Sequence, residues 1–297
     1  MAACFWQGVL GVEILLAVLM DLLARSAFAL SGAAALALLP VLLALSPWIL
    51  AGIALAIWRP SNAQRAGSLR RLCSLEPAHV TLSALSMSAQ WPCNAPPGTS
   101  ESCGAGRPVL LIHGLLCNGA LWRTLCKRLG RAGWGPVRAV SLEPLMADLD
   151  SHAQRIELEL RALQGQCGGE RVTIITHSMG GLIARAALRG AGSNVIRRIV
   201  TIACPHHGTW FAPRVKLRPV RQMRPGSDWL QALNAAQEGR FAVPVTSIYS
   251  VDDALIAPAR SAALAGASCQ ELSGLGHFGL LRAGGSIERI LRALAAD

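Results

Sequence analysis

The sequence has few charged and few aromatic residues for a chain of its length. Charged residues make up 15% of the 297 residues and aromatic residues 5%, with a single tyrosine. A nucleic-acid-binding module needs basic residues interleaved with aromatic ones on a recognisable fold, so this scarcity argues against a nucleic-acid partner. Lysine occurs only at Lys127 and Lys216, and arginine supplies nearly all of the formal net charge of +11. That charge either reflects the composition of the source genome or serves to attract the protein to anionic lipid headgroups.

The sequence also lacks a CxxC motif and any cluster of cysteine with histidine. Nine cysteines, an odd number, are scattered along the chain, which favours reduced thiols over a disulfide framework. Cys93 and Cys103, which flank a loop rich in Pro, Gly and Ser, are the one pair that the sequence leaves open. His206 and His207 are adjacent and point apart, and no third ligand follows at a zinc-like spacing. We therefore expect no metal site.

Charge is absent altogether from residues 26–58. Residues 4–24 are also apolar, interrupted by Glu13 and Asp21. About 20 apolar residues cross a bilayer, so both stretches are predicted transmembrane helices. Together they form a membrane anchor over residues 1–58.

A cleaved secretory signal is the alternative interpretation of this N-terminus, with Ala27-Phe28-Ala29 as the cleavage site. Against it, the start carries no Lys or Arg, and a second long apolar run follows. The basic residues near the anchor are Arg25 between the two stretches and Arg59, Arg65, Arg70 and Arg71 after them. The positive-inside bias predicts a cytoplasmic catalytic domain, held at a membrane of the bacterial inner-membrane type.

The most informative motif is a serine between a strand and a helix. The apolar run Val172–Ile175 leads to Ser178, and two glycines and the helix-like segment 182–189 follow. A strand that turns directly into a helix at a serine exposes the hydroxyl on a strained corner and needs small residues two before and two after it. Gly180 meets this requirement, whereas Thr176 stands where glycine is usual.

A serine nucleophile needs a histidine base and an acid that orients this base. The β-branched-rich segment 243–250 predicts a strand, and Asp252 and Asp253 lie just past its end. Segment 267–272 predicts another strand, which is followed by His277 in a glycine-flanked loop. The order serine, acid, histidine is that of nucleophile-elbow enzymes. The spacing alone leaves both aspartates open.

An earlier apolar strand, over residues 109–116, contains His113-Gly114. A tetrahedral intermediate needs two N–H donors for its oxyanion. We expect the backbone N–H groups of Met179 and Leu115 to provide them, and His113 to shape the loop.

These motifs resemble those of the α/β-hydrolase superfamily, specifically its triacylglycerol-lipase-like members, over roughly residues 105–295. The segments that carry the resemblance are 108–116 (PVLLIHGLL), 176–181 (THSMGG), 201–209 (TIACPHHGT), 250–258 (SVDDALIAP) and Gly276-His277. In the family pattern SxxDxxVxP the acid is three residues after the serine, which selects Asp253 over Asp252. The resemblance implies a triad of Ser178, Asp253 and His277 and no cofactor.

Strands alternate with helices along residues 107–297, which predicts a mostly parallel sheet with helices on both faces. The resemblance implies that this sheet has the α/β-hydrolase fold, and the transmembrane helices precede it. Residues 59–106 form a basic juxtamembrane linker with an outlying strand and a Pro/Gly/Ser-rich loop. An insert over 208–240 mixes apolar and basic residues, as expected of a lid or a lipid-docking cap. Alternatively, its apolar residues simply pack on the sheet.

The sequence therefore predicts a membrane-anchored serine hydrolase that cleaves carboxylic esters, foremost lipid acyl esters. An acyl-thioesterase or a small-ester carboxylesterase would use the same residues. Outside the enzymes, the alternative is an inactive hydrolase scaffold that serves as a partner of a membrane protein.

Overall fold

The computed structural model describes residues 107–210 and 217–295 of the chain. Within these residues no helix is both long and apolar enough to cross a membrane. The two predicted spans, the linker, Cys93 and Cys103 all lie outside the described residues.

The centre of the described fold is a six-stranded sheet in the order β2-β1-β3-β4-β5-β6. Every neighbouring pair in it is parallel, which confirms the predicted parallel sheet. The strands are β1 (Val109–Ile112), β2 (Val137–Val140), β3 (Val172–His177), β4 (Ile196–Ile202), β5 (Val245–Ser250) and β6 (Ser268–Leu272).

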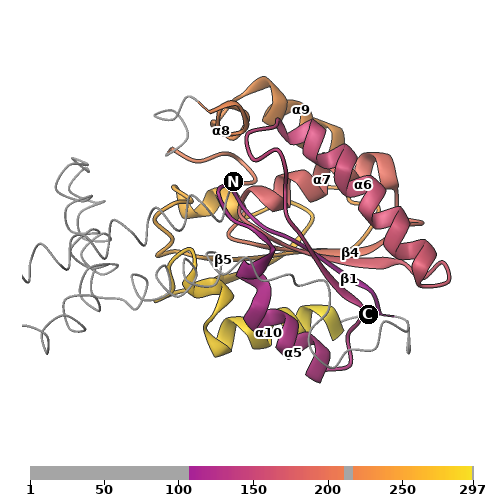
Figure 1. The fold of residues 1–297 in the computed structure, drawn as a ribbon. Coiled ribbons are helices and arrows are strands. Elements are labelled where there is room, and N and C mark those ends of the chain that lie inside the picture. Colours follow the sequence, from indigo (N-terminus) through magenta and orange to yellow (C-terminus); the bar gives the residue numbers. More distant parts are fainter. Residues whose placement is uncertain (1–106, 211–216, 296–297) are drawn as a thin grey trace, which may run out of the picture.

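Helices cover both faces of this sheet, as Figure 1 shows, with α6, α7 and α9 on one face and α5 and α10 on the other. The helices are α5 (Arg123–Arg131), α6 (Leu149–Gln166), α7 (Met179–Ala191), α8 (Arg218–Gln222), α9 (Asp228–Gln237) and α10 (Gly284–Ala295). Short 3-10 helices are η1 (Gly119–Trp122), η3 (Ala259–Ala262) and η4 (Gly279–Leu281).

The two faces of the sheet have separate hydrophobic cores. In β1, Leu110 and Ile112 belong to the core under α6 and α7, whereas Val109 and Leu111 belong to the core over α5 and α10. Side chains alternate between the faces of a strand, so a strand buried on both sides is apolar at most of its positions. This explains the uninterrupted apolar run in the sequence.

Helix starts follow their capping residues. Helix α6 begins at Leu149, because Asp148 accepts a hydrogen bond from the Ser151 N–H at 2.8 Å and so caps the helix. In the insert, Ser227 caps α9 by accepting from the Leu230 N–H at 3.3 Å. The short helix α8 was not predicted.

The cysteines of the described core carry no disulfide. Cys117, Cys126 and Cys204 are buried thiols, and burial raises the pKa of the Cys117 thiol to about 12 and that of the Cys204 thiol as well. The thiols of Cys117 and Cys204 therefore stay protonated and act as small apolar side chains.

Candidate active site

Ser178 sits on a sharp corner between β3 and α7. Its backbone has φ 54° and ψ −126°, a conformation that few L-residues adopt. The Ser178 N–H donates to the carbonyl of Ile202 at 2.8 Å, which ties the corner to β4. At Gly180 an added Cβ would lie 2.5 Å from the carbonyl oxygen of Ile112. The backbone of α7 therefore approaches that of β1 so closely that only glycine fits at position 180.

Thr176 takes the place of the usual glycine without disturbing the corner. Its hydroxyl is buried and donates to the carbonyl of Val200 at 3.4 Å. The room comes from Gly181, where a Cβ would lie 2.5 Å from the Cys204 sulfur and 3.2 Å from the Thr176 hydroxyl. A glycine on the helix side of the corner thus accommodates the threonine on the strand side.

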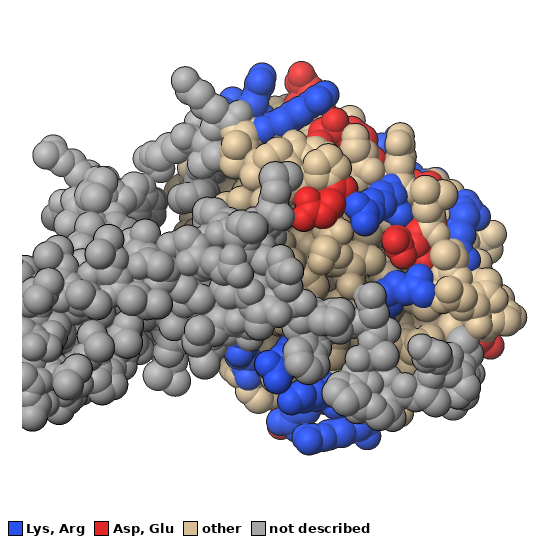
Figure 2. Space-filling view, viewed as in Figure 1, with Lys and Arg blue, Asp and Glu red and all other residues tan. Residues whose placement is uncertain are grey.

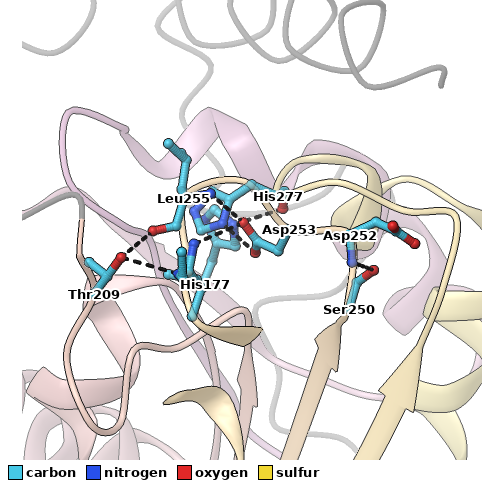
Figure 3. Close-up of polar contacts among 9 residues, drawn as sticks. His177, Thr209, Ser250, Asp252, Asp253, Leu255 and His277 are labelled. Atoms are coloured by element: carbon cyan, nitrogen blue, oxygen red, sulfur yellow. Dashed lines mark hydrogen bonds and ion pairs between the residues drawn. The ribbon is translucent and has the colours of Figure 1, made fainter. Parts of the chain in front are cut away.

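His277 and Asp253 form a buried hydrogen-bonded pair, with 2.8 Å between Nδ1 and Oδ2 (Figure 3). The other carboxylate oxygen, Oδ1, accepts from the N–H groups of Leu255 at 2.8 Å and Ile256 at 3.1 Å. Because the carboxylate accepts, His277 Nδ1 carries the proton, and Nε2 is left with a lone pair that can take up another. Asp253, on the loop after β5, therefore orients a base that lies on the loop after β6.

Asp252 faces away from this pair in Figure 3. Its N–H donates to the Ser250 hydroxyl at 3.1 Å, and its Oδ2 accepts from the Gly274 N–H at 2.7 Å. The Ser250 contact bends the chain so that the next residue, Asp253, turns inward. Of the two aspartates that the spacing left open, the structure brings Asp253 to His277 and gives Asp252 the task of tying two loops together.

The loop after β1 packs closely against Ser178. The Cys117 N–H closes a turn on the Gly114 carbonyl at 3.3 Å, and Leu115 lies inside this turn. A Cβ on Gly114 would lie 2.8 Å from the Ser178 Cβ. Leu115 and Met179, the two expected oxyanion donors, thus flank Ser178: one lies on the adjoining loop and the other is the first residue of α7.

His113 holds this loop in shape. Its Nδ1 donates to the Gly114 carbonyl at 2.8 Å, and its Nε2 accepts from the Leu142 N–H at 2.9 Å. Complete burial lowers the pKa of His113 to about 4, so the ring is neutral at physiological pH. These contacts agree with a structural role.

Ser178 and His277 line one cavity of about 250 Å³. Most of the remaining wall is apolar, and the insert supplies part of it through Val220 on α8 and Met223 directly after it. The other apolar side chains in the wall are Leu115, Leu116, Cys117, Pro205, Leu255, Ile256 and Phe278. An acyl chain fits such a lining better than a polar group does.

Thr209 is a supporting residue that was not singled out from the sequence. Its hydroxyl donates to the Leu255 carbonyl at 2.6 Å and accepts from the Ala257 N–H at 3.3 Å. It therefore braces the loop that carries Asp253 (Figure 3). The only signal was its place at the end of the segment PHHGT.

His206, in the same segment, is held by protein groups. Its Nε2 lies 3.0 Å from the Thr201 hydroxyl, and its Nδ1 accepts from the buried guanidinium of Arg185 at 3.3 Å. The same guanidinium donates to Gln237 and Asn234 of α9, both at 2.8 Å, and so joins the insert to α7. Within the described residues, no group of three or more His, Cys, Asp or Glu is placed to hold a metal ion.

Comparison with known proteins gives one family match and several similar structures. The PGAP1-like alpha/beta domain matches residues 149–217, a stretch that includes Ser178 but is less than half of the chain. No curated protein matches the chain.

Among solved structures, lipase B of Aspergillus fumigatus superposes with a TM-score of 0.61 at 20% identity, covering 68% of this chain and 55% of the lipase. The chain thus spans little more than half of that lipase. The mature lipase BlEst2 of Bacillus licheniformis gives a TM-score of 0.58 at 16% identity, over 68% of this chain and 96% of BlEst2. At identities this low the likeness concerns the fold alone: these lipases share the arrangement of the described part of the chain.

Proposed function

We propose that the chain is a serine hydrolase of carboxylic esters, with Ser178 as nucleophile, His277 as base and Asp253 as the acid that orients it. The observation that carries the proposal is the 2.8 Å pair of His277 and Asp253 at the cavity that Ser178 also lines. A strained serine, an oriented base and an apolar cavity are what acyl transfer needs.

The reaction proceeds in two halves. Ser178 Oγ attacks the ester carbonyl while His277 Nε2 takes its proton, and the N–H groups of Leu115 and Met179 stabilise the oxyanion. His277 then gives the proton to the leaving alcohol as the ester C–O bond breaks. Water, deprotonated by His277, attacks the acyl-enzyme and releases the carboxylic acid and the free serine.

Lipid acyl esters are the proposed substrates, because the walls of the cavity are apolar. A series of p-nitrophenyl esters of two to sixteen carbons, with matching thioesters, tests this on the full-length chain in detergent. Preference for longer oxygen esters supports a lipase. Preference for acetate would support a small-ester carboxylesterase, and preference for thioesters a thioesterase. An inactive scaffold would turn over none of them.

The predicted membrane anchor leads to a topological test. A fusion of green fluorescent protein after Arg71 should fluoresce and a fusion of alkaline phosphatase there should be inactive, because the basic residues that follow the second apolar stretch favour the cytoplasmic side. Active phosphatase at this junction would place the catalytic domain on the far side of the membrane.

Lipid contact at the mouth of the cavity is proposed from the insert and its surroundings. Trp210, 53% exposed, follows Thr209 of the cavity wall. Arg218, Arg221 and Arg224 line a second cavity of about 690 Å³, but acidic residues share it, and Arg218 lies 3.4 Å from Asp148. Figure 2 likewise shows basic and acidic side chains side by side along the upper rim, whereas basic ones dominate the lower edge.

A charge-matched pair of variants tests this contact. Changing Arg218, Arg221 and Arg224 to Gln should slow turnover on anionic vesicles more than on neutral ones. The same change at Lys127, Arg128 and Arg131 of α5, on the other face of the sheet, should not. The effect should shrink above about 0.5 M salt, because screening shortens the reach of the charges. Equal losses from both triple variants would show a general charge effect instead of docking by the insert.

A further inference from the structure

His177, the residue before the nucleophile, contacts the proposed base directly. The centroids of the His177 and His277 rings are 4.4 Å apart, with the ring planes inclined at 54°. His177 Nε2 also lies 3.2 Å from the backbone carbonyl oxygen of His277. Phe278 packs against both rings, with each centroid distance 5.6 Å. One side chain of β3 thus reaches both the ring and the main chain of the residue that must take the serine proton (Figure 3).

The hydrogen bond defines the protonation state of His177. A carbonyl oxygen only accepts, so Nε2 carries the hydrogen. Burial lowers the pKa of His177 far below its ordinary value, with a further contribution from the nearby His277, and the ring is therefore neutral. A neutral ring does not oppose the positive charge that His277 acquires during acyl transfer. A protonated ring at this distance would do so.

The base and the nucleophile are fixed to different parts of the fold. His277 lies in a glycine-flanked loop after β6, outside any strand or helix, and Asp253 fixes the Nδ1 end of its ring. Ser178, in contrast, is fixed to β4 through its N–H. The contact of His177 Nε2 with the His277 carbonyl links β3, which leads directly into Ser178, to the loop that carries the base.

We propose that His177 is a positioning residue, which holds the His277 backbone at the distance from Ser178 that proton transfer requires. This inference rests on the proposed function. It assigns no chemical step to His177, which acts on the reaction through His277. The competing explanation is a ring that fills space in the core, with an incidental hydrogen bond.

Two variants separate these explanations. His177→Gln keeps an N–H donor near the position of Nε2 and removes the ring, whereas His177→Phe keeps the ring and removes the donor. We expect His177→Phe to lower kcat by about 10²-fold with little change in KM, since a misplacement of about 1 Å costs this much, and His177→Gln to recover most of the loss. A space-filling role predicts the reverse order, because the ring would matter and the donor would not.

Nuclear magnetic resonance of the full-length chain, labelled with ¹⁵N-histidine and held in detergent, gives a readout besides activity. An ordinary histidine changes its charge between about pH 5 and pH 8. Across this range the His177 ring should stay neutral, with its hydrogen on Nε2. The Nδ1 proton that His277 shares with Asp253 should stay sharp in His177→Gln and broaden in His177→Phe.

The outcomes distinguish the inference from the function on which it rests. Unaltered kcat in His177→Phe, or a His177 ring that titrates normally, would overturn the positioning role and leave the proposed function intact. Losses of kcat and melting temperature in His177→Gln that match or exceed those in His177→Phe would also overturn it, in favour of packing. If the unaltered chain showed no ester hydrolysis, or hydrolysis that persisted in Ser178→Ala, the proposed function itself would be overturned.

Discussion

Ser178→Ala and His277→Ala should each lower kcat by about 10⁶-fold, because nucleophile and base act as a unit and either loss removes the chemistry of both. The double variant should be no slower than either single one. Rates on a p-nitrophenyl ester, measured with the full-length chain in detergent, test this expectation. Unchanged melting temperatures serve as the control that the variants are folded.

Additive losses would contradict this account. If the double variant were slower than the single ones by the product of their effects, Ser178 and His277 would act independently. A different nucleophile would then have to be sought.

Asp253→Asn should lower kcat by about 10⁴-fold, because the amide can no longer hold His277 in the tautomer that leaves Nε2 free. Asp252→Asn is the matched control on the neighbouring residue. Its amide oxygen can still accept from the Gly274 N–H, which Asp252 now binds at 2.7 Å, so the loop should keep its shape and kcat should change little. The same ester assay compares the two variants.

The comparison of the two asparagine variants decides which aspartate orients His277. A larger loss from Asp252→Asn would mean that this residue, and not Asp253, orients the base. Comparable losses would mean that the ties between the loops matter more than the identity of the acid.

The sheet could be predicted from the sequence because its strands are buried on both faces. A strand such as β3 then forms an apolar run whose end is visible, and the structure places that end at His177, next to Ser178. The order of the strands had no such signal, because it depends on contacts between segments far apart in the chain. Helix α8 was not predicted for a similar reason. A proline, Pro219, among basic residues is typical of a loop, and Val220 and Met223 are recognisable as buried only once the core that they cover is known.

The residues of the candidate site could be predicted from the sequence, but the residues that hold their loops in place could not. The order of Ser178, the aspartates and His277 follows from motif and topology, whereas the choice between Asp252 and Asp253 came from the family pattern. The hydrogen bonds of Thr209 to the acid loop and of His177 to the His277 carbonyl join residues 46 and 100 positions apart, respectively. Such pairings follow from the folded chain and leave no local pattern in the sequence.

Labelling by a fluorophosphonate probe tests the central claim most directly. The probe forms a covalent bond with a serine that an adjacent base activates, and mass spectrometry of the labelled full-length chain locates the adduct. We predict a single adduct on Ser178, which is absent from Ser178→Ala and strongly reduced in His277→Ala. An unlabelled chain, or an adduct on any other residue, would contradict the proposed triad.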